Sequence, residues 1–473
     1  MKFLISKLFL TKCAVFVCCF AAFQPPVRAQ QSGEPERTQL LNGLRVVFLP
    51  RPGDQSVLIK LRIHSGAAFD LAGKAGSAAL LGDILFPDLS TREYFTEEMQ
   101  GRLNVATDYD SITITMQGRA REFERIIEIL RTAVVTSQLT PENFAKVRDG
   151  RIKVTKETAI STGMVADRAI AARLFGEFPY GRPYNGAVES LERVVRGDLM
   201  LVRDRFLNPN NATLAIIGGV DPGRARRALR QLLGIWRKSE QVIPPTFRQP
   251  TAPDARTLII SAPADQSVEV RLAVRGLARK DPDSIVAGVL SQVARQRLEK
   301  SIPELSRSPV FVRHDAFNLP GMFVVGAAVE HLLAGKFLHD AREVMSSLVA
   351  APVSVAELDQ ARNEILATRN KELAKPEGVA DSWLDMDTYG LSSAAEQTRV
   401  ITAITPNDLQ RVATRLFRDA AIASVAVGNS ELVRTSVERY GKVELIGEVV
   451  SNSQTAPDQN SGTPQTKAPA KPE

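Results

Sequence analysis

Cysteine and histidine are scarce in this 473-residue sequence, and their positions exclude several kinds of site. The three cysteines, Cys13, Cys18 and Cys19, all lie close to the N-terminus, so the remaining chain has no thiol for a disulfide bond, a thiolate nucleophile or a sulfur-ligated metal. None of the histidines has a second one four residues away, the spacing that places two imidazoles on one face of a helix. They are His64, His314, His331 and His339.

The sequence also lacks an apolar run of the ~20 residues that a transmembrane helix needs. The apolar residues 14–23 follow Lys2, Lys7 and Lys12 and precede the small-x-small triplet Val27-Arg28-Ala29. This order is typical of a secretory signal peptide, whereas a mitochondrial presequence would be rich in arginine. We therefore predict a signal peptide at residues 1–29 and an exported protein, periplasmic or secreted, with no transmembrane span in the mature chain.

Charge of one sign is not in excess once this segment is removed. The full chain has 60 basic and 53 acidic residues, and the segment holds four basic residues and no acidic ones, which leaves 56 against 53. A balance so close to neutral does not indicate nucleic-acid binding. We interpret the densest basic stretch, residues 224–238, as the solvated face of a helix rather than a site for anionic lipid or an acidic partner. The chain also lacks the G-x-S-x-G elbow and the Walker loop.

An internal repeat is the main feature that the sequence does contain. The tetrapeptide Asp54-Gln55-Ser56-Val57 recurs 211 residues later as Asp265-Gln266-Ser267-Val268. Apolar residues alternate after both copies, which indicates a strand with one buried face. Further along, Asp198-Leu199 and Asp408-Leu409 each begin a helical pattern, and an apolar strand pattern follows each one.

The repeat predicts two homologous domains, at residues 38–238 and 256–447, joined by a linker at residues 239–255 that contains four prolines. Strands alternate irregularly with long helices, such as one at residues 122–137. This pattern favours the α+β class, in which each domain has an antiparallel-rich sheet with helices packed on one face. Residues 451–473 have almost no apolar side chains, so we predict a disordered tail.

Six short motifs follow one another along the first copy of the repeat. They are Leu41-Asn42-Gly43-Leu44-Arg45-Val46, Gly66, Gly73-Lys74-Ala75-Gly76, Gly101-Arg102-Leu103-Asn104-Val105-Ala106-Thr107, Pro179-Tyr180-Gly181-Arg182-Pro183 and Asn208-Pro209-Asn210-Asn211. In this order they resemble the pitrilysin/insulinase family of zinc metallopeptidases, the inverzincins, across nearly all of the first copy. The duplication resembles the paired homologous domains of that family.

The chemistry of that family requires H-x-x-E-H on a helix, because the two histidines hold Zn²⁺ and the glutamate deprotonates the metal-bound water. Alignment on Gly76 and Phe86 places Ala79, Gly82 and Asp83 at the His, Glu and His positions. All three functional groups are missing. The resemblance therefore predicts no catalytic residue and no bound metal, although zinc is expected in the family.

The third zinc ligand of the family is a glutamate on a later helix, and the apolar register places Lys156 at this position. A lysine there would repel a metal ion. A register shifted by one residue brings in Glu157, and Asp83 with Glu157 could bind Ca²⁺ or Mg²⁺ weakly. The favoured interpretation is that both are ordinary surface or inter-helix charges.

The segment with Asn104, Ala106 and Thr107 corresponds to the edge strand on which family members bind an extended peptide, by main-chain pairing and a side-chain amide contact. Such pairing needs no catalytic residue. The alternative is that Asn104 only holds a bend and Thr107 only favours a strand.

A preserved scaffold without catalytic residues predicts a non-catalytic subunit that pairs with a zinc-bearing homologous subunit and helps to enclose or bind unstructured peptides. Two alternatives stay open. One is a self-associating peptide-binding scaffold, which would form a homodimer, and the other is a metallopeptidase with unusual metal ligands.

Overall fold

The computed structural model describes residues 34–136, 138–158, 161–240, 247–262, 267–302 and 309–446. The predicted signal peptide, the predicted tail and residues 241–246 of the predicted linker lie outside these ranges. The described chain from Glu36 onward belongs to one compact unit. No helix within the ranges is long and apolar enough to cross a membrane.

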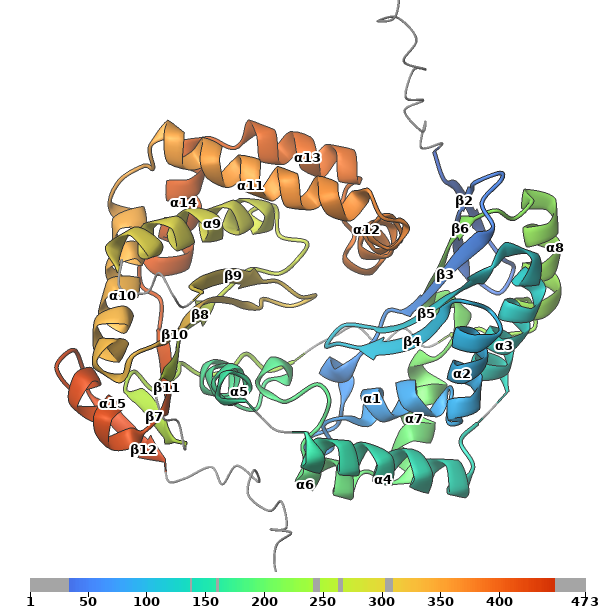
Figure 1. Cartoon of the computed structure of the whole chain (residues 1–473), viewed down its shortest axis with the longest axis horizontal. Coiled ribbons are helices and arrows are strands. Elements are labelled where there is room, and N and C mark those ends of the chain that lie inside the picture. The colour runs from blue at the N-terminus through green and yellow to red at the C-terminus, as the bar shows by residue number, and fades with distance from the viewer. Residues whose placement is uncertain are drawn as a thin grey trace, which may run out of the picture. The chain divides into compact units, whose positions relative to one another are not determined.

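The first half contains a six-stranded sheet with the strand order β1-β2-β6-β3-β5-β4 (Figure 1). Strands β2 and β6 are parallel, and the other neighbouring pairs are antiparallel. The chain therefore places the β4–β5 hairpin at one edge of the sheet. The strands are β1 (Glu36–Gln39), β2 (Arg45–Pro50), β3 (Ser56–Ile63), β4 (Arg102–Thr107), β5 (Ile112–Arg119) and β6 (Ala212–Gly218).

Apart from α5, the helices of the first half share one hydrophobic core with one face of this sheet, as predicted. The predicted helix at residues 122–137 is α3, whose Ile126, Ile127 and Leu130 are buried at helical spacing. Helix α4 begins after Thr140, because the Thr140 side chain accepts a hydrogen bond from the amide of Asn143. The helices are α1 (Ser77–Ile84), α2 (Leu89–Glu97), α3 (Phe123–Val135), α4 (Pro141–Glu157), α5 (Thr162–Phe175), α6 (Val188–Arg193), α7 (Arg196–Phe206) and α8 (Pro222–Leu233).

The second half repeats this architecture, which confirms the predicted duplication. Its sheet has the order β12-β7-β11-β8-β10-β9, so β7 to β11 occupy the places of β2 to β6. The sixth strand differs, because β1 precedes β2 and is antiparallel to it, whereas β12 follows β11 and is parallel to β7. The strands are β7 (Thr257–Ser261), β8 (Val268–Arg275), β9 (Phe311–Asp315), β10 (Met322–Val329), β11 (Ala423–Gly428) and β12 (Val443–Ile446). The helices are α9 (Ser284–Ser301), α10 (Ala334–Ala350), α11 (Val355–Leu373), α12 (Pro376–Tyr389), α13 (Ala394–Ala403), α14 (Pro406–Phe417) and α15 (Ser430–Val437).

The two halves exchange one helix each. Ile170 of α5, in the first half, is buried in one cluster with Leu258 of β7 and Val425 of β11, on the second face of the second sheet. In return, Leu384 of α12 is buried with Ile217 of β6 on the second face of the first sheet. Helices α5 and α12 hold the same place in the order of elements, so the exchange follows the duplication.

This exchange explains the burial of β3. The alternating apolar residues from Val57 to Ile63 face the core of their own half, as the sequence predicts. The sequence predicts only one buried face, however, and Leu58, Lys60 and Arg62 are also buried. Helix α12 covers that second face, and only the fold brings it there.

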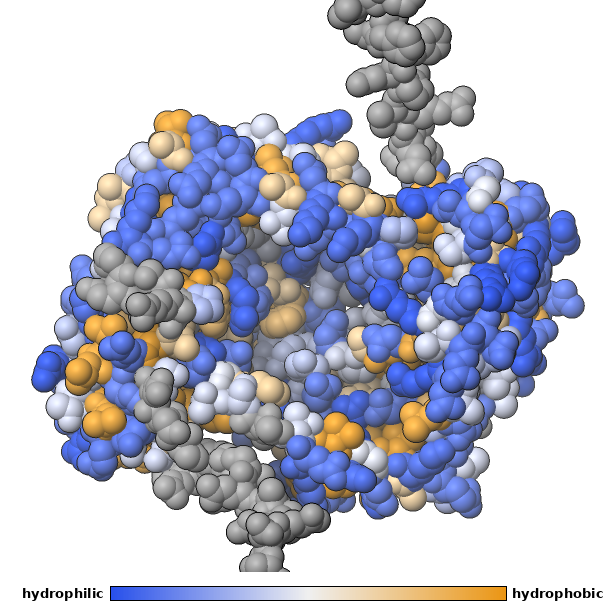
Figure 2. Space-filling model, viewed as in Figure 1, coloured by the Kyte–Doolittle hydropathy of each residue, from blue (hydrophilic) through white to orange (hydrophobic). Residues whose placement is uncertain are grey.

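The basic stretch at residues 224–238 forms most of α8. Ala228 and Leu229 are buried against the core, whereas Arg226 and Arg230 are exposed. The surface over this helix is hydrophilic (Figure 2). Arg224 pairs with Glu124 of α3, so part of the basic charge is neutralised within the chain. This arrangement agrees with the prediction that the basic stretch is the solvated face of a helix.

Candidate functional site

Helix α1 carries the residues that correspond to H-x-x-E-H, namely Ala79, Gly82 and Asp83. The helix is short and almost wholly buried. The carboxylate of Asp70 holds its first turn, since it accepts hydrogen bonds from the amides of Gly76 at 2.7 Å and Ala78 at 2.9 Å. Burial raises the pKa of Asp70 to about 7. The helix is thus a packed structural element.

Gly82 occupies the position of the catalytic glutamate, and a side chain here would be tightly packed against its neighbours. A Cβ atom at this position would lie 3.0 Å from Oγ1 of Thr107 and 3.2 Å from Cγ1 of Val105. Both neighbours belong to β4, so the backbone of α1 packs directly on the edge strand. Ala79, one turn earlier, has an exposed fraction of 1%. A larger side chain at either position would therefore press on its neighbours in the packed interior.

Asp83 occupies the second histidine position and is paired with a cation. Nε of Arg151, on α4, donates to Oδ2 of Asp83 at 2.7 Å. The basic residue in contact with Asp83 is therefore Arg151, five positions before Lys156. Lys156 itself lies 3.5 Å from the carboxylate of Glu192 on α6.

The residues present do not fit a zinc ion. The two carboxylates of the Ca²⁺ or Mg²⁺ hypothesis, Asp83 and Glu157, pair with different bases, Arg151 and Lys153. Among the described residues no group of three or more His, Cys, Asp or Glu side chains is arranged to hold a metal.

Strand β4 carries the predicted peptide-binding residues at the edge of the first sheet. In the described part of the chain β4 pairs with β5 alone. Asn104 and Ala106 are exposed, whereas Thr107 is half-buried beside Gly82. The other edge of β4 thus offers main-chain groups for pairing with an extended chain, with the Asn104 side chain next to them.

The tip of the β4–β5 hairpin meets the tip of the β9–β10 hairpin of the second half. Oδ2 of Asp110 accepts a hydrogen bond from the amide of Asn318 at 2.9 Å. The Tyr180 hydroxyl donates to Oδ1 of Asp110 at 3.2 Å and accepts from the amide of Leu319 at 3.0 Å. Burial raises the pKa of Asp110 to about 6. The edge strand therefore ends at a hydrogen-bonded contact between the halves.

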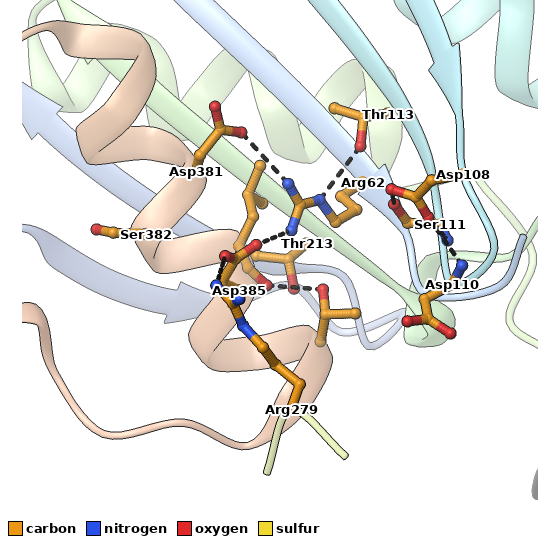
Figure 3. Close-up of polar contacts among 12 residues, drawn as sticks. Arg62, Asp108, Asp110, Ser111, Thr113, Thr213, Arg279, Asp381, Ser382 and Asp385 are labelled. Carbon is orange, nitrogen blue, oxygen red and sulfur yellow. Dashed lines mark hydrogen bonds and ion pairs between the residues drawn. The ribbon is translucent and has the colours of Figure 1, made fainter. Parts of the chain in front are cut away.

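A second polar contact between the halves lies under α12 (Figure 3). Arg62 of β3 contacts Asp385 at 2.6 Å and Asp381 at 3.3 Å, and Asp385 also contacts Arg279 at 3.3 Å. The sequence analysis did not identify this cluster. The sequence does contain a sign of it, because Lys60 and Arg62 lie on the same face of β3. If that face is buried, its two cations require acidic partners.

His64 continues this polar face and is not a surface residue. Its Nδ1 lies 2.9 Å from the hydroxyl of Thr388 on α12, and its Nε2 lies 3.0 Å from the hydroxyl of Thr213. Burial, together with the charges of Arg45 and Arg62, lowers the pKa of His64 to about 3. Both ring nitrogens of His64 are therefore engaged with hydroxyl groups, and the low pKa favours the neutral ring.

A duplicated α+β fold, with an altered H-x-x-E-H helix packed against an edge strand, defines the class of two-domain metallopeptidase homologues. The model of the insulinase family, peptidase family M16, matches residues 45–186, and the model of the peptidase M16 inactive domain matches residues 193–365. The chain belongs to this insulinase/pitrilysin-type family and is a peptidase-like member of it.

Individual relatives are distant. An uncharacterised zinc protease of Mycobacterium leprae is 26% identical over 44% of this chain and 48% of its own length. An uncharacterised zinc protease of Mycobacterium tuberculosis is 24% identical over 81% of this chain and 91% of its own length. A probable mitochondrial-processing peptidase subunit beta of Schizosaccharomyces pombe is 21% identical over 84% of this chain and 92% of its own length. The crystal structure of a protease from Helicobacter pylori superimposes with a TM-score of 0.76 at 18% identity, over 83% of this chain and 99% of that one, which shows the shared fold.

Proposed function

We propose that this protein is a catalytically inactive member of its family, a subunit that pairs with a zinc-bearing homologue and helps to enclose or bind peptides. The observation that carries the proposal is the packing of Gly82 on β4, together with the ion pair between Asp83 and Arg151. Hydrolysis by this family requires a metal-bound water and a base beside it. At α1 the metal-bound water would lack its histidine ligands, and no glutamate is present to act as the base.

Pairing is supported by the preserved scaffold and by the relatives. The Schizosaccharomyces pombe relative is named as a subunit, and so is a mouse relative, cytochrome b-c1 complex subunit 1, which is 21% identical over 56% of this chain. We further propose that the chain is exported through a signal peptide at residues 1–29, so its zinc-bearing partner would be exported too.

Peptide binding is assigned to β4. An extended peptide would add a strand to the open edge, where main-chain hydrogen bonds supply affinity without any catalytic residue. Asn104 and Ala106 are exposed on this strand, and the Asn104 amide would bind the main chain of the peptide. Thr107 would position the strand, because it already packs on α1.

The test of inactivity and pairing uses the purified chain alone and with a zinc-bearing homologue from the same cell. After exposure to zinc and desalting, we expect much less than one zinc per chain and no chelator-sensitive hydrolysis of unstructured peptides. With the homologue, we expect a heterodimer by light scattering and faster hydrolysis than by the homologue alone. One zinc per chain would contradict the proposal. A homodimer that does not bind the homologue would favour the self-associating scaffold.

Asn104→Ala tests the peptide site. We expect a two- to tenfold loss of peptide affinity by fluorescence anisotropy, since one side-chain hydrogen bond contributes ~0.5–1.5 kcal/mol. Gln55→Ala is the matched control, because it removes another exposed amide of the first half. Equal affinity of wild type and Asn104→Ala would show that the amide takes no part in binding.

A further inference from the structure

A pocket of about 560 Å³ lies in the second half, between the start of α9, the end of β9, α11 and the connection from α12 to α13. Two kinds of side chain dominate its lining, one basic and one aliphatic. The basic residues are Arg279, Lys280 and Arg369. The aliphatic residues are Ile285, Ile365, Leu391, Val400 and Ile401.

The basic groups of the pocket are not fully paired. Arg369 donates to Oε1 of Gln397 at 3.1 Å and to the carbonyl of Ala394 at 3.4 Å, and its buried Nε has no hydrogen-bond partner. Within the described residues no carboxylate lies at ion-pair distance from Arg369 or from the exposed Lys280. Burial, and then the charge of nearby Arg279, lower the pKa of Arg369, whereas the charges of Glu372 and Asp385 raise it. Arg279 itself contacts Asp385 at 3.3 Å. The lining holds three basic side chains and one carboxylate, Asp281, so its charge is positive on balance.

The acidic residues around the start of α9 do not cancel this charge. The carboxylates of Asp281 and Asp283 both contact Arg415, at 2.7 Å in each case. Asp283 precedes the helix, yet its side chain makes no capping hydrogen bond. Ser284 and Ile285, in the first turn, line the pocket, so the positive end of the α9 dipole adds to the basic side chains.

The aliphatic wall narrows the choice of anion. A free phosphate or sulfate makes no use of apolar side chains, whereas the last residue of a peptide combines a carboxylate with a side chain. Val400 and Leu391 are half-buried, and Ile401 is buried at 4% exposure. We propose that this pocket binds the C-terminal residue of a peptide, with the α-carboxylate on Arg279 and Arg369 and an aliphatic side chain against this wall.

The pocket stands beside the contact at which β4 ends. The amide of Arg279 donates to the carbonyl of Phe317 at 2.7 Å, in the β9–β10 hairpin tip. The ring of Phe317 lies 5.2 Å from that of Tyr109, in the β4–β5 tip. The inference rests on the proposed function, and it selects peptides with a free, aliphatic C-terminus among those that β4 would bind.

The test measures binding of two synthetic peptides to the purified chain by fluorescence anisotropy. Both have the same unstructured sequence ending in leucine, one with a free carboxylate and one amidated. We expect the free acid to bind about tenfold more tightly, since charge-assisted bonds to arginine are lost on amidation. Arg279→Gln and Arg369→Gln should each reduce this preference, whereas Arg399→Gln, an exposed arginine of α13 outside the pocket, should not. Lys280→Gln, at an exposed position, gives a third test if Arg369→Gln fails to fold.

The outcomes separate the pocket from the peptide-binding function. Equal affinity of the two peptides would overturn the pocket assignment and leave binding at β4 intact. No binding of either peptide would overturn both. A preference that persists in Arg279→Gln and Lys280→Gln would place the carboxylate elsewhere. A further control is an amidated peptide that ends in aspartate. If it binds as tightly as the free acid, the pocket accepts any carboxylate, which overturns the assignment to the C-terminus.

Discussion

At the scale of residues, Gly82 shows how closely α1 packs on β4. A glutamate at this position would bring its Cβ atom to 3.0 Å from Thr107 and 3.2 Å from Val105, so α1 or β4 would have to shift to accept it. The ion pair of Asp83 with Arg151 closes the neighbouring position in the same way. Placing H-x-x-E-H on α1 would therefore require adjustments in β4 and α4 as well.

Gly82→Glu is expected to lower the free energy of unfolding by ~1–3 kcal/mol, because it overpacks the contact between α1 and β4. Urea unfolding followed by circular dichroism measures the change. The matched control is Gly150→Glu in α4, where a Cβ atom meets nothing within 4 Å. That change should be neutral or stabilising by up to ~1 kcal/mol, since glycine weakens a helix interior. Equal stability of the two variants would mean that α1 can move away from β4.

The replacement of H-x-x-E-H by Ala79, Gly82 and Asp83 could be recognised from the sequence, because this motif has a fixed spacing within one helix. The contact of Asp83 with Arg151 could not, because it joins two helices whose relative rotation no local pattern records. The apolar pattern of α4 predicts Lys156 near the site, whereas the packing of α4 on α1 brings Arg151 into contact with Asp83. The cavity around Arg369 was missed for the same reason, since its lining comes from α9, β9, α11, α13 and the connections next to them.

At the scale of elements, the exchanged helices α5 and α12 determine how each sheet is buried. The period-two pattern of β3 predicts its strand and its inward face correctly. The second face was missed because its cover comes from the other half of the chain. A near-continuous run of buried residues, as in β6, is the general sign of a strand covered on both faces.

Leu384→Ala should cost ~2–5 kcal/mol of unfolding free energy, because it removes a fully buried side chain at the contact between α12 and the first sheet. Differential scanning calorimetry should show one transition at a lower temperature, since each half depends on a helix of the other. Val355→Ala, an apolar residue of α11 that is 65% exposed, should change the stability by less than ~0.5 kcal/mol. Two separate transitions in the variant would show that the halves are stable without the exchange.

At the scale of the whole molecule, the hairpin tips join the halves through a buried carboxyl group, Asp110. Its folded-state pKa of about 6 is raised above the ordinary value of 3.8 by burial. Between these pH values the folded state retains a proton that the unfolded state has released. This group therefore lowers the stability as the pH rises from about 4 to about 6, and its unfavourable effect is complete above that window.

Asp110→Asn removes this titration. Urea unfolding of both proteins at several pH values should show the variant gaining stability relative to wild type between pH 4 and pH 6, with a constant difference above. Any hydrogen bond that the amide makes less well shifts the whole curve and leaves its slope unaffected. Parallel curves across this range would contradict the assignment of the raised pKa to Asp110.

The exchange of α5 and α12 has the form of a domain swap made permanent within one chain. If the halves were separate chains, the binding of each helix to its sheet would depend on the protein concentration. Here the covalent connection keeps the two halves together, so this binding is intramolecular. The apolar faces of the central strands are consequently occupied before any partner arrives. The proposed second subunit would then dock on the outer surfaces of the helices or on the free edges of the sheets, so a change of partner would leave the hydrophobic cores untouched.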